Sequence, residues 1–155
     1  MFPHDLLPGT DPFRAHARAP CGSHAHVLCS PQPTDLKNTP TALGGGPALL
    51  KDGQPTQFQS SDARHPRSAI GWNAEFFFLV QVDGRQRGQS VGMSLAELAA
   101  HFTRLGCTEA LNLDGGGSST LWARGQIMNT PCEGSERPMG NVLIITLEPR
   151  AAEPR

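Results

Sequence analysis

The chain has 155 residues, enough for one domain with a modest core, and a formal net charge of −1. Only 17% of the residues are charged, while glycine (17) and proline (14) are abundant, so turns and loops should be frequent. The near-neutral charge excludes an overall basic field for nucleic acid or an anionic membrane, and no apolar run approaches the roughly 20 residues of a membrane-spanning helix.

Residues 1–40 are expected to form an irregular arm, because no strand or helix period persists among their many proline, histidine and serine residues. The N-terminus has no charged region followed by an apolar core, so we expect no signal peptide. Cys21, His24, His26 and Cys29 are of zinc-binding types. Their spacing matches no common zinc module, so we expect no metal or other cofactor, with a disulfide as the alternative.

From residue 41 the pattern indicates a folded domain that extends to residue 148, followed by a polar tail at 149–155. Runs rich in apolar residues and separated by glycine turns predict short strands and hairpins. The expected strands and turns are, in chain order, 48–51 with the Asp52-Gly53 turn, 68–72, 76–82 with Asp83-Gly84, 111–113, 119–123 and 126–129 around Arg124-Gly125, and 141–147.

One helix is predicted over residues 94–105. Ser94 and Glu97 have the spacing of a capping box, in which each side chain bonds the backbone amide of the other residue. The apolar residues that fall on one face at helical spacing are Leu95, Leu98, Ala99, Phe102 and Leu105. Gly106 follows as a stop signal. Several hairpins and this one helix predict an α+β fold, with the helix covering a mainly antiparallel or mixed sheet.

The most informative stretch runs from Ala110 to Thr120, where a short apolar run ends in Asp114 and three glycines and three hydroxyl residues follow. Glycine allows close approach of the backbone to a ligand, and successive N–H groups in such a turn can form a nest for an anion. A carboxylate beside that nest indicates hydrolysis or transfer at a charged substrate. A tight loop with a capping aspartate is the alternative.

This stretch resembles the signature of the phosphodiester glycosidase family, which includes N-acetylglucosamine-1-phosphodiester α-N-acetylglucosaminidase and bacterial relatives. Other segments resemble family motifs in the same order, from about Thr41 to Leu147. They are Leu43–Pro47 with Asp52-Gly53, Arg64–Gly71, Val82–Arg85 before Gly92–Leu95, and Glu136–Asn141. We find no counterpart in residues 1–40 to the Asn-Gly turn and aromatic strand of the family, so the chain resembles the C-terminal part of that domain.

The resemblance implies cleavage of a sugar-1-phosphodiester at the anomeric C–O bond. Asp114 is then the first candidate for nucleophile or base, and Glu136 is the second carboxylate, because an oxocarbenium-like transition state needs a nearby carboxylate. Arg67 and Arg137 could hold the phosphate oxygens in a planar fork. The other expected substrate-binding residues are Asn112, Gly115, Gly116, Gly117, Ser118, Ser119 and Asn141.

Less specific interpretations stay open for several of these residues. Arg67 and Arg137 could form surface ion pairs. His65 could act as a general base, but a histidine before proline in a loop is more often a solvated side chain. Trp72 and Trp122 are expected in the core rather than as platforms for sugar rings. A non-catalytic module that binds a glycan or sugar phosphate, or an inactive fragment of such an enzyme, is the alternative function. Self-association is a further expectation. The cellular location stays open, because the family is often extracytoplasmic whereas we expect no signal peptide.

Overall fold

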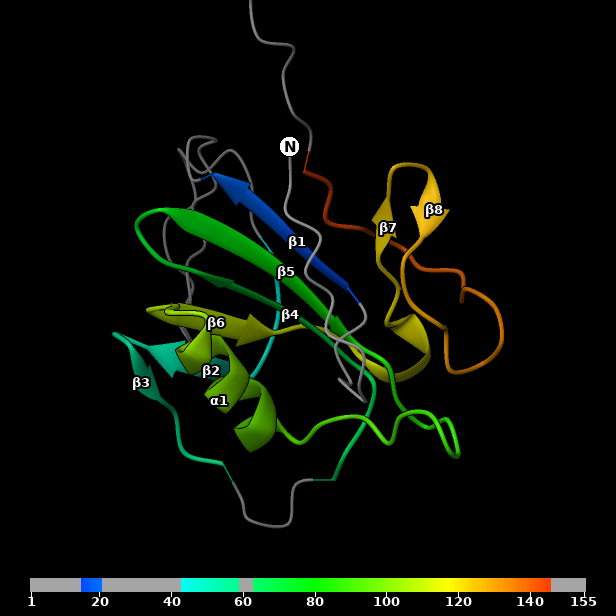
Figure 1. Ribbon diagram of the computed structural model, residues 1–155, viewed down its shortest axis with the longest axis horizontal. Helices are drawn as coiled ribbons and strands as arrows, with labels where there is room; N and C mark the ends of the chain where they lie inside the picture. The colour runs from blue at the N-terminus through cyan, green and yellow to red at the C-terminus, as the bar shows by residue number, and fades with distance from the viewer. Residues whose placement is uncertain (1–14, 21–42, 59–62, 146–155) are drawn as a thin grey trace, which may run out of the picture.

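The computed structural model describes residues 15–20, 43–58 and 63–145. A six-stranded sheet with the order β1-β5-β4-β6-β2-β3 forms the body, one helix packs on it, and a separate two-stranded hairpin pairs β7 with β8 (Figure 1). The strands are β1 (Ala15–Pro20), β2 (Ala48–Lys51), β3 (Gln54–Pro55), β4 (Arg67–Trp72), β5 (Phe76–Val82), β6 (Glu109–Asn112), β7 (Trp122–Ala123) and β8 (Gln126–Ile127).

The predicted α+β class is confirmed, and every strand pairing in the described part of the chain is antiparallel. Both predicted two-residue hairpin turns are present. Asp52 (φ 50°) and Gly53 (φ 75°) join β2 to β3, and Arg124 (φ 53°) and Gly125 (φ 77°) join β7 to β8. Two successive positive φ angles give a turn whose twist matches that of paired strands, which explains these short connections.

The middle of the sheet determines where polar loops meet. β5 and β6 are both antiparallel to β4, so they run in the same direction on its two sides, and α1 (Leu95–Arg104) lies in the connection between them. Arg67, the first residue of β4, is opposite Val82, the last residue of β5. Asn112, the last residue of β6, is opposite Ala69. The loops after β5 and β6 therefore leave the sheet beside the loop that precedes β4.

Helix α1 forms as predicted. The Ser94 side chain accepts a hydrogen bond from the Glu97 amide (3.2 Å), and the Glu97 carboxylate accepts one from the Ser94 amide (2.9 Å). The helix ends at Leu105, and Gly106 follows with φ 73°. Both ends therefore use the local signals read from the sequence.

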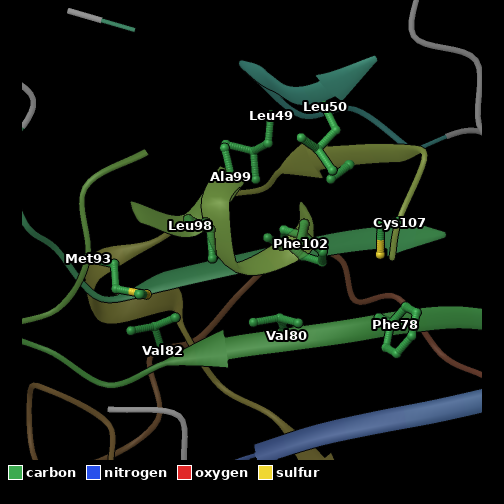
Figure 2. Packing of buried hydrophobic residues seen from close by; sticks show 12 residues of the cluster. Leu49, Leu50, Phe78, Val80, Val82, Met93, Leu98, Ala99, Phe102 and Cys107 are labelled. Atoms are coloured by element: carbon green, nitrogen blue, oxygen red, sulfur yellow. The ribbon is translucent and has the colours of Figure 1, made fainter. Parts of the chain in front are cut away.

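The core lies between α1 and the sheet, where Leu98 and Phe102 face strand residues that include Val80 and Phe78 (Figure 2). Gly71 leaves the space that the ring of Phe102 needs, because a Cβ there would come within 2.4 Å of it. Cys107 is buried in the same cluster, and burial raises the pKa of its thiol to about 11.

The structure corrects two predictions of local structure. Residues 15–20, in the segment expected to be irregular, form β1 along the edge of β5. An open sheet edge offers backbone donors and acceptors to an extended segment whatever its side chains, so the pairing needs no apolar period. Residues 141–145 of the predicted strand 141–147 form no strand, because they pair with none of the described strands. Residues 146–147 lie outside the described ranges, as do Cys21, His24, His26 and Cys29.

The described residues contain no cluster of three or more histidine, cysteine, aspartate or glutamate side chains suited to a metal ion. Across the same ranges, no helix has the length and apolar character needed to cross a membrane.

Candidate active site

A hollow of about 470 Å³ opens where the three central strands bring their loops together. Its walls come from the loop before β4, the loop after β5, the glycine turn after β6, and the segment 131–140. The polar and charged residues that line it are His65, Arg67, Arg85, Asn112, Asp114 and Arg137. Three of these side chains are guanidinium cations and one is a carboxylate, so the hollow favours an anionic ligand.

Asp114 lies at the start of the glycine turn, directly after β6 and Leu113, and is exposed. Its Oδ1 accepts a hydrogen bond from the Gly115 amide (2.9 Å). Within the described residues, Asp114 forms no ion pair with any of the three arginines that line the hollow. The carboxylate therefore has an oxygen available for a ligand or for water.

The glycines after Asp114 form a short 3₁₀ turn, η1 (Gly116–Ser118), in which the Ser118 amide donates to the Gly115 carbonyl (3.2 Å). The Gly116 amide donates to the Pro66 carbonyl (3.0 Å), and the Gly115 amide is the one bonded to Asp114. Two of the three amides expected to contact a substrate thus already have partners. Position 115 has no room for a side chain, because a Cβ on Gly115 would lie 2.7 Å from the Pro66 carbonyl oxygen.

Arg67 reaches the hollow from the first position of β4, but its guanidinium already donates hydrogen bonds to backbone carbonyls. Its Nε donates to the Met93 carbonyl and its Nη2 donates to the Ala63 carbonyl, both at 3.0 Å. These bonds connect β4 to the loop before it and to the residue that precedes the helix cap. Arg67 therefore shapes the wall of the hollow as well as lining it.

Arg137 comes from the segment after β8 and forms an ion pair with Glu133. The pair lies against Gly117, where a Cβ would come within 2.3 Å of Glu133 Oε1 and 2.5 Å of Arg137 Nη2. The small size of this third glycine is what lets the segment 131–140 close over the turn.

Arg85 and His65 also line the hollow, and the sequence analysis did not select either as a site residue. Arg85 follows the Asp83-Gly84 turn, and its Nη2 lies 3.4 Å from Nδ1 of His65. His65 is fixed by two backbone hydrogen bonds with Met93 (3.2 and 3.0 Å). The signal that could have identified Arg85 is its place directly after the strand next to β4, the same relation that Asp114 has to β6.

Asn112 is buried behind the turn and supports the opposite wall of the hollow. Its Nδ2 donates to the Gly46 carbonyl (2.8 Å) and to the Leu113 carbonyl (2.9 Å), and its backbone carbonyl accepts from the Gly46 amide (2.7 Å). Its Oδ1 has no hydrogen-bond partner within the described residues. The early glycine turn and the later one are thus joined through one asparagine.

A buried polar network supports the glycine turn from behind. Asp83, only 4% exposed, accepts hydrogen bonds from the Thr130 amide (3.1 Å), Asn129 Nδ2 (3.3 Å) and Gln81 Nε2 (3.3 Å). Asn129 Nδ2 also donates to the Ser119 carbonyl (3.0 Å). This network connects the end of β5 with the residue that follows the 3₁₀ turn.

Four residues expected at the site lie outside the lining of the hollow. Ser118 and Ser119 are buried, and Ser119 shares a hydroxyl–hydroxyl bond with Ser68 (3.3 Å). Glu136 accepts a hydrogen bond from the indole N–H of Trp122, and Asn141 is exposed in the segment after it. Trp122, expected in the core, is 53% exposed.

The structure is thus an α+β protein with a hollow that is lined by a carboxylate, three arginines and a glycine turn. A sequence profile described as phosphodiester glycosidase matches residues 6–146. The chain belongs to the phosphodiester glycosidase family. The match begins within residues 1–40, where the sequence analysis found no family motif.

Three individual proteins illustrate the similarity. An uncharacterized SPbeta prophage-derived protein of Bacillus subtilis, YomE, is 34% identical over 104 residues, which are 63% of this chain and 16% of that protein. The structure of the zebrafish N-acetylglucosamine-1-phosphodiester α-N-acetylglucosaminidase catalytic domain, auto-inhibited by its pro-peptide, is similar at 27% identity and a TM-score of 0.49, over 57% of this chain and 34% of that one. A hypothetical protein from Synechocystis is similar at 30% identity and a TM-score of 0.48, over 60% and 19% of the two chains. This chain thus spans about a third or less of the length of these proteins.

Proposed function

We propose that the protein hydrolyses a sugar-1-phosphodiester at the anomeric C–O bond, with Asp114 as the reacting carboxylate. The observation that carries this proposal is the Asp114 carboxylate, which forms no ion pair within the described residues and lies in a hollow with three arginines. A phosphodiester has one negative charge between two organic groups, and guanidinium groups match its oxygens in shape and charge. Membership in the phosphodiester glycosidase family supports the same substrate class.

In the proposed reaction, an oxygen forms a new bond to the anomeric carbon while the bond from that carbon to the phosphate oxygen breaks. The electron pair leaves with the phosphate, so the products are the free sugar and a phosphate monoester of the alcohol. Asp114 either attacks the carbon and is released by water, or takes the proton from an attacking water. A phosphate monoester is a good leaving group, so one carboxylate is sufficient, and Glu136, which binds Trp122, has no required role.

The first test is ³¹P NMR of the methyl diester of N-acetylglucosamine-1-phosphate incubated with the protein. We expect a methyl phosphate signal with the original chain and a loss of rate of at least about a thousandfold in Asp114→Asn, because removal of a reacting carboxylate removes transition-state stabilisation. Asp52→Asn is the matched control, since Asp52 lies in the β2–β3 turn, outside the lining of the hollow. Full activity in Asp114→Asn would refute the role of Asp114.

The bond that breaks is identified by carrying out the reaction in ¹⁸O-labelled water. Cleavage at the anomeric carbon leaves the methyl phosphate without label, whereas attack at phosphorus places ¹⁸O in it and shifts its ³¹P signal. Labelled methyl phosphate would refute the proposed bond cleavage. An unchanged diester that nevertheless binds to a cooperatively folded protein would favour the alternative, a sugar phosphate-binding module.

A further inference from the structure

The three arginines of the hollow differ in how far their hydrogen-bonding capacity is already used. Arg67 donates to two backbone carbonyls, and Arg137 is paired with Glu133. Within the described residues, Arg85 has one partner, Nδ1 of His65 at 3.4 Å, and no carboxylate. A guanidinium has five N–H donors, so Arg85 keeps most of them for a ligand.

The guanidinium of Arg85 lies directly over the glycine turn. A Cβ on Gly116 would come within 3.1 Å of Arg85 Nη1 and 3.4 Å of Nη2. Gly116 is two residues after Asp114, so the guanidinium of Arg85 lies over the same turn that Asp114 begins, and both side chains line the hollow. That is the arrangement that a substrate with a sugar carbon next to a phosphate group requires.

The backbone of Arg85 adds an independent observation. Its φ of 57° lies in the left-handed region, where a residue with a Cβ is disfavoured by about 1 kcal/mol or more and glycine is favoured. Its neighbour Gly84 cannot accept a side chain, because a Cβ there would lie 2.7 Å from the Pro66 nitrogen. An arginine in a strained backbone conformation at the wall of a hollow indicates a function for its side chain.

We propose that Arg85 binds the phosphodiester anion of the substrate and that His65 orients it. Arginine always donates, so Nδ1 of His65 accepts, and this bond holds one edge of the guanidinium while another edge faces the phosphate oxygens in a bidentate pair. Arg67 and Arg137 then mainly shape the site. The proposal rests on the proposed function for its substrate class, but its test measures binding and needs no turnover.

The test titrates the methyl diester of N-acetylglucosamine-1-phosphate into the Asp114→Asn protein, with and without Arg85→Gly, and measures the dissociation constant by calorimetry. Loss of a charge-assisted bidentate contact should weaken binding about tenfold or more. Binding of uncharged N-acetylglucosamine should not change, and Arg85→Lys should restore part of the diester affinity. Arg87→Gly is the matched control, because Arg87 is exposed in the same loop and does not line the hollow.

Arg85→Gly also separates function from folding, because glycine suits the left-handed backbone. We expect its thermal midpoint to equal or exceed that of the unchanged chain while its diester affinity falls. Equal diester affinity with and without Arg85, or no binding by Asp114→Asn, would overturn the role of Arg85. Loss of binding on removal of Arg85 from a chain that never hydrolyses the diester would overturn the proposed function and leave the role of Arg85 supported.

Discussion

The glycines around Asp114 are required for different physical reasons, which only the contacts reveal. A Cβ on Gly115 would meet a backbone carbonyl, and one on Gly117 would meet the ends of the Glu133 and Arg137 side chains. Backbone atoms cannot move without strain, whereas the ends of side chains can. Gly115 is therefore required by the backbone fold, whereas Gly117 is required for the close approach of the segment 131–140.

This difference predicts the effect of alanine at Gly115. Gly115→Ala should lower the free energy of unfolding by about 1–3 kcal/mol, the usual range for overpacking, as measured by urea unfolding. Gly44→Ala is the control, because nothing lies within 4 Å of a Cβ at that position and we expect little change. Equal stability of the two variants would contradict the close approach between Gly115 and Pro66.

The sequence could predict Asp114 as a candidate site residue, which lines the hollow, because a carboxylate at the end of a strand and before a glycine run is visible in one local stretch. It could not distinguish the arginines from one another. Arg67 and Arg85 both lie beside turn residues in the sequence. They differ because the guanidinium of Arg67 donates to the carbonyl of Met93, which is more than 20 residues away along the chain, whereas that of Arg85 contacts His65. Such contacts follow from the order of the strands, which no local pattern contains.

At the scale of elements, the helix was the most predictable part, because capping and amphipathic spacing are both local. Glu97 is central to its start, since the same carboxylate accepts from the Ser94 amide and pairs with Arg64. The hydrogen bond from the Ser94 backbone, with a smaller contribution from Arg64, holds the pKa of Glu97 below its usual value of 4.5. A lowered pKa in the folded state stabilises the fold above the unfolded pKa, and this stabilisation is lost as the pH falls through the folded pKa.

Glu97→Gln should therefore destabilise the protein by about 1 kcal/mol or less near pH 7, as expected for an exposed cap and ion pair. The difference in thermal midpoint from the unchanged chain should shrink as the pH falls from 4.5 through the lower pKa that Glu97 has in the folded protein, where its carboxylate becomes protonated. Thermal unfolding followed by circular dichroism over a pH series measures this difference in thermal midpoint. Glu75→Gln is the control, because Glu75 is exposed in the β4–β5 turn. A difference that does not depend on pH would show that charge is not involved.

The elements that sequence analysis misjudged are those that depend on a neighbour. β1 forms because β5 offers an edge, although its own residues show no strand period. Residues 141–145 have a strong strand pattern, yet they form none in the absence of a described partner strand. Strand propensity indicates that a segment fits a sheet, but pairing determines whether the strand exists.

At the scale of the whole molecule, the described surface contains several large apolar side chains. The most exposed lie in the β5–α1 connection, in the β7–β8 hairpin and in the segment after it, namely Val91, Trp122, Met128, Met139, Val142 and Ile144. Exposed apolar side chains favour association with another surface where they gather into a patch. The expectation of self-association made from the sequence stays a prediction.

We predict that the protein self-associates as its concentration rises, and that Val142→Lys combined with Ile144→Lys weakens this association. Light scattering coupled to size-exclusion chromatography measures the mass at each concentration. Gln89→Lys is the matched control, because Gln89 is exposed in the β5–α1 connection and is not apolar. A chain that stays monomeric at every concentration would contradict the prediction.

The fit of the Phe102 ring against Gly71 also affects the geometry of the hollow. Asp114 follows β6 and Arg67 begins β4, so their separation depends on how these two strands are aligned along their length. A slip of two residues would keep each side chain on its face of the sheet but would displace one strand by about 7 Å, more than twice the reach of a hydrogen bond. The aromatic ring of Phe102 fits at Gly71, where a two-residue slip of β4 would place the Cβ of Ala69 or Asn73, so this contact fixes the position of β4 along the helix. The alignment of the charged groups is thus set partly by an apolar contact near the opposite end of β4.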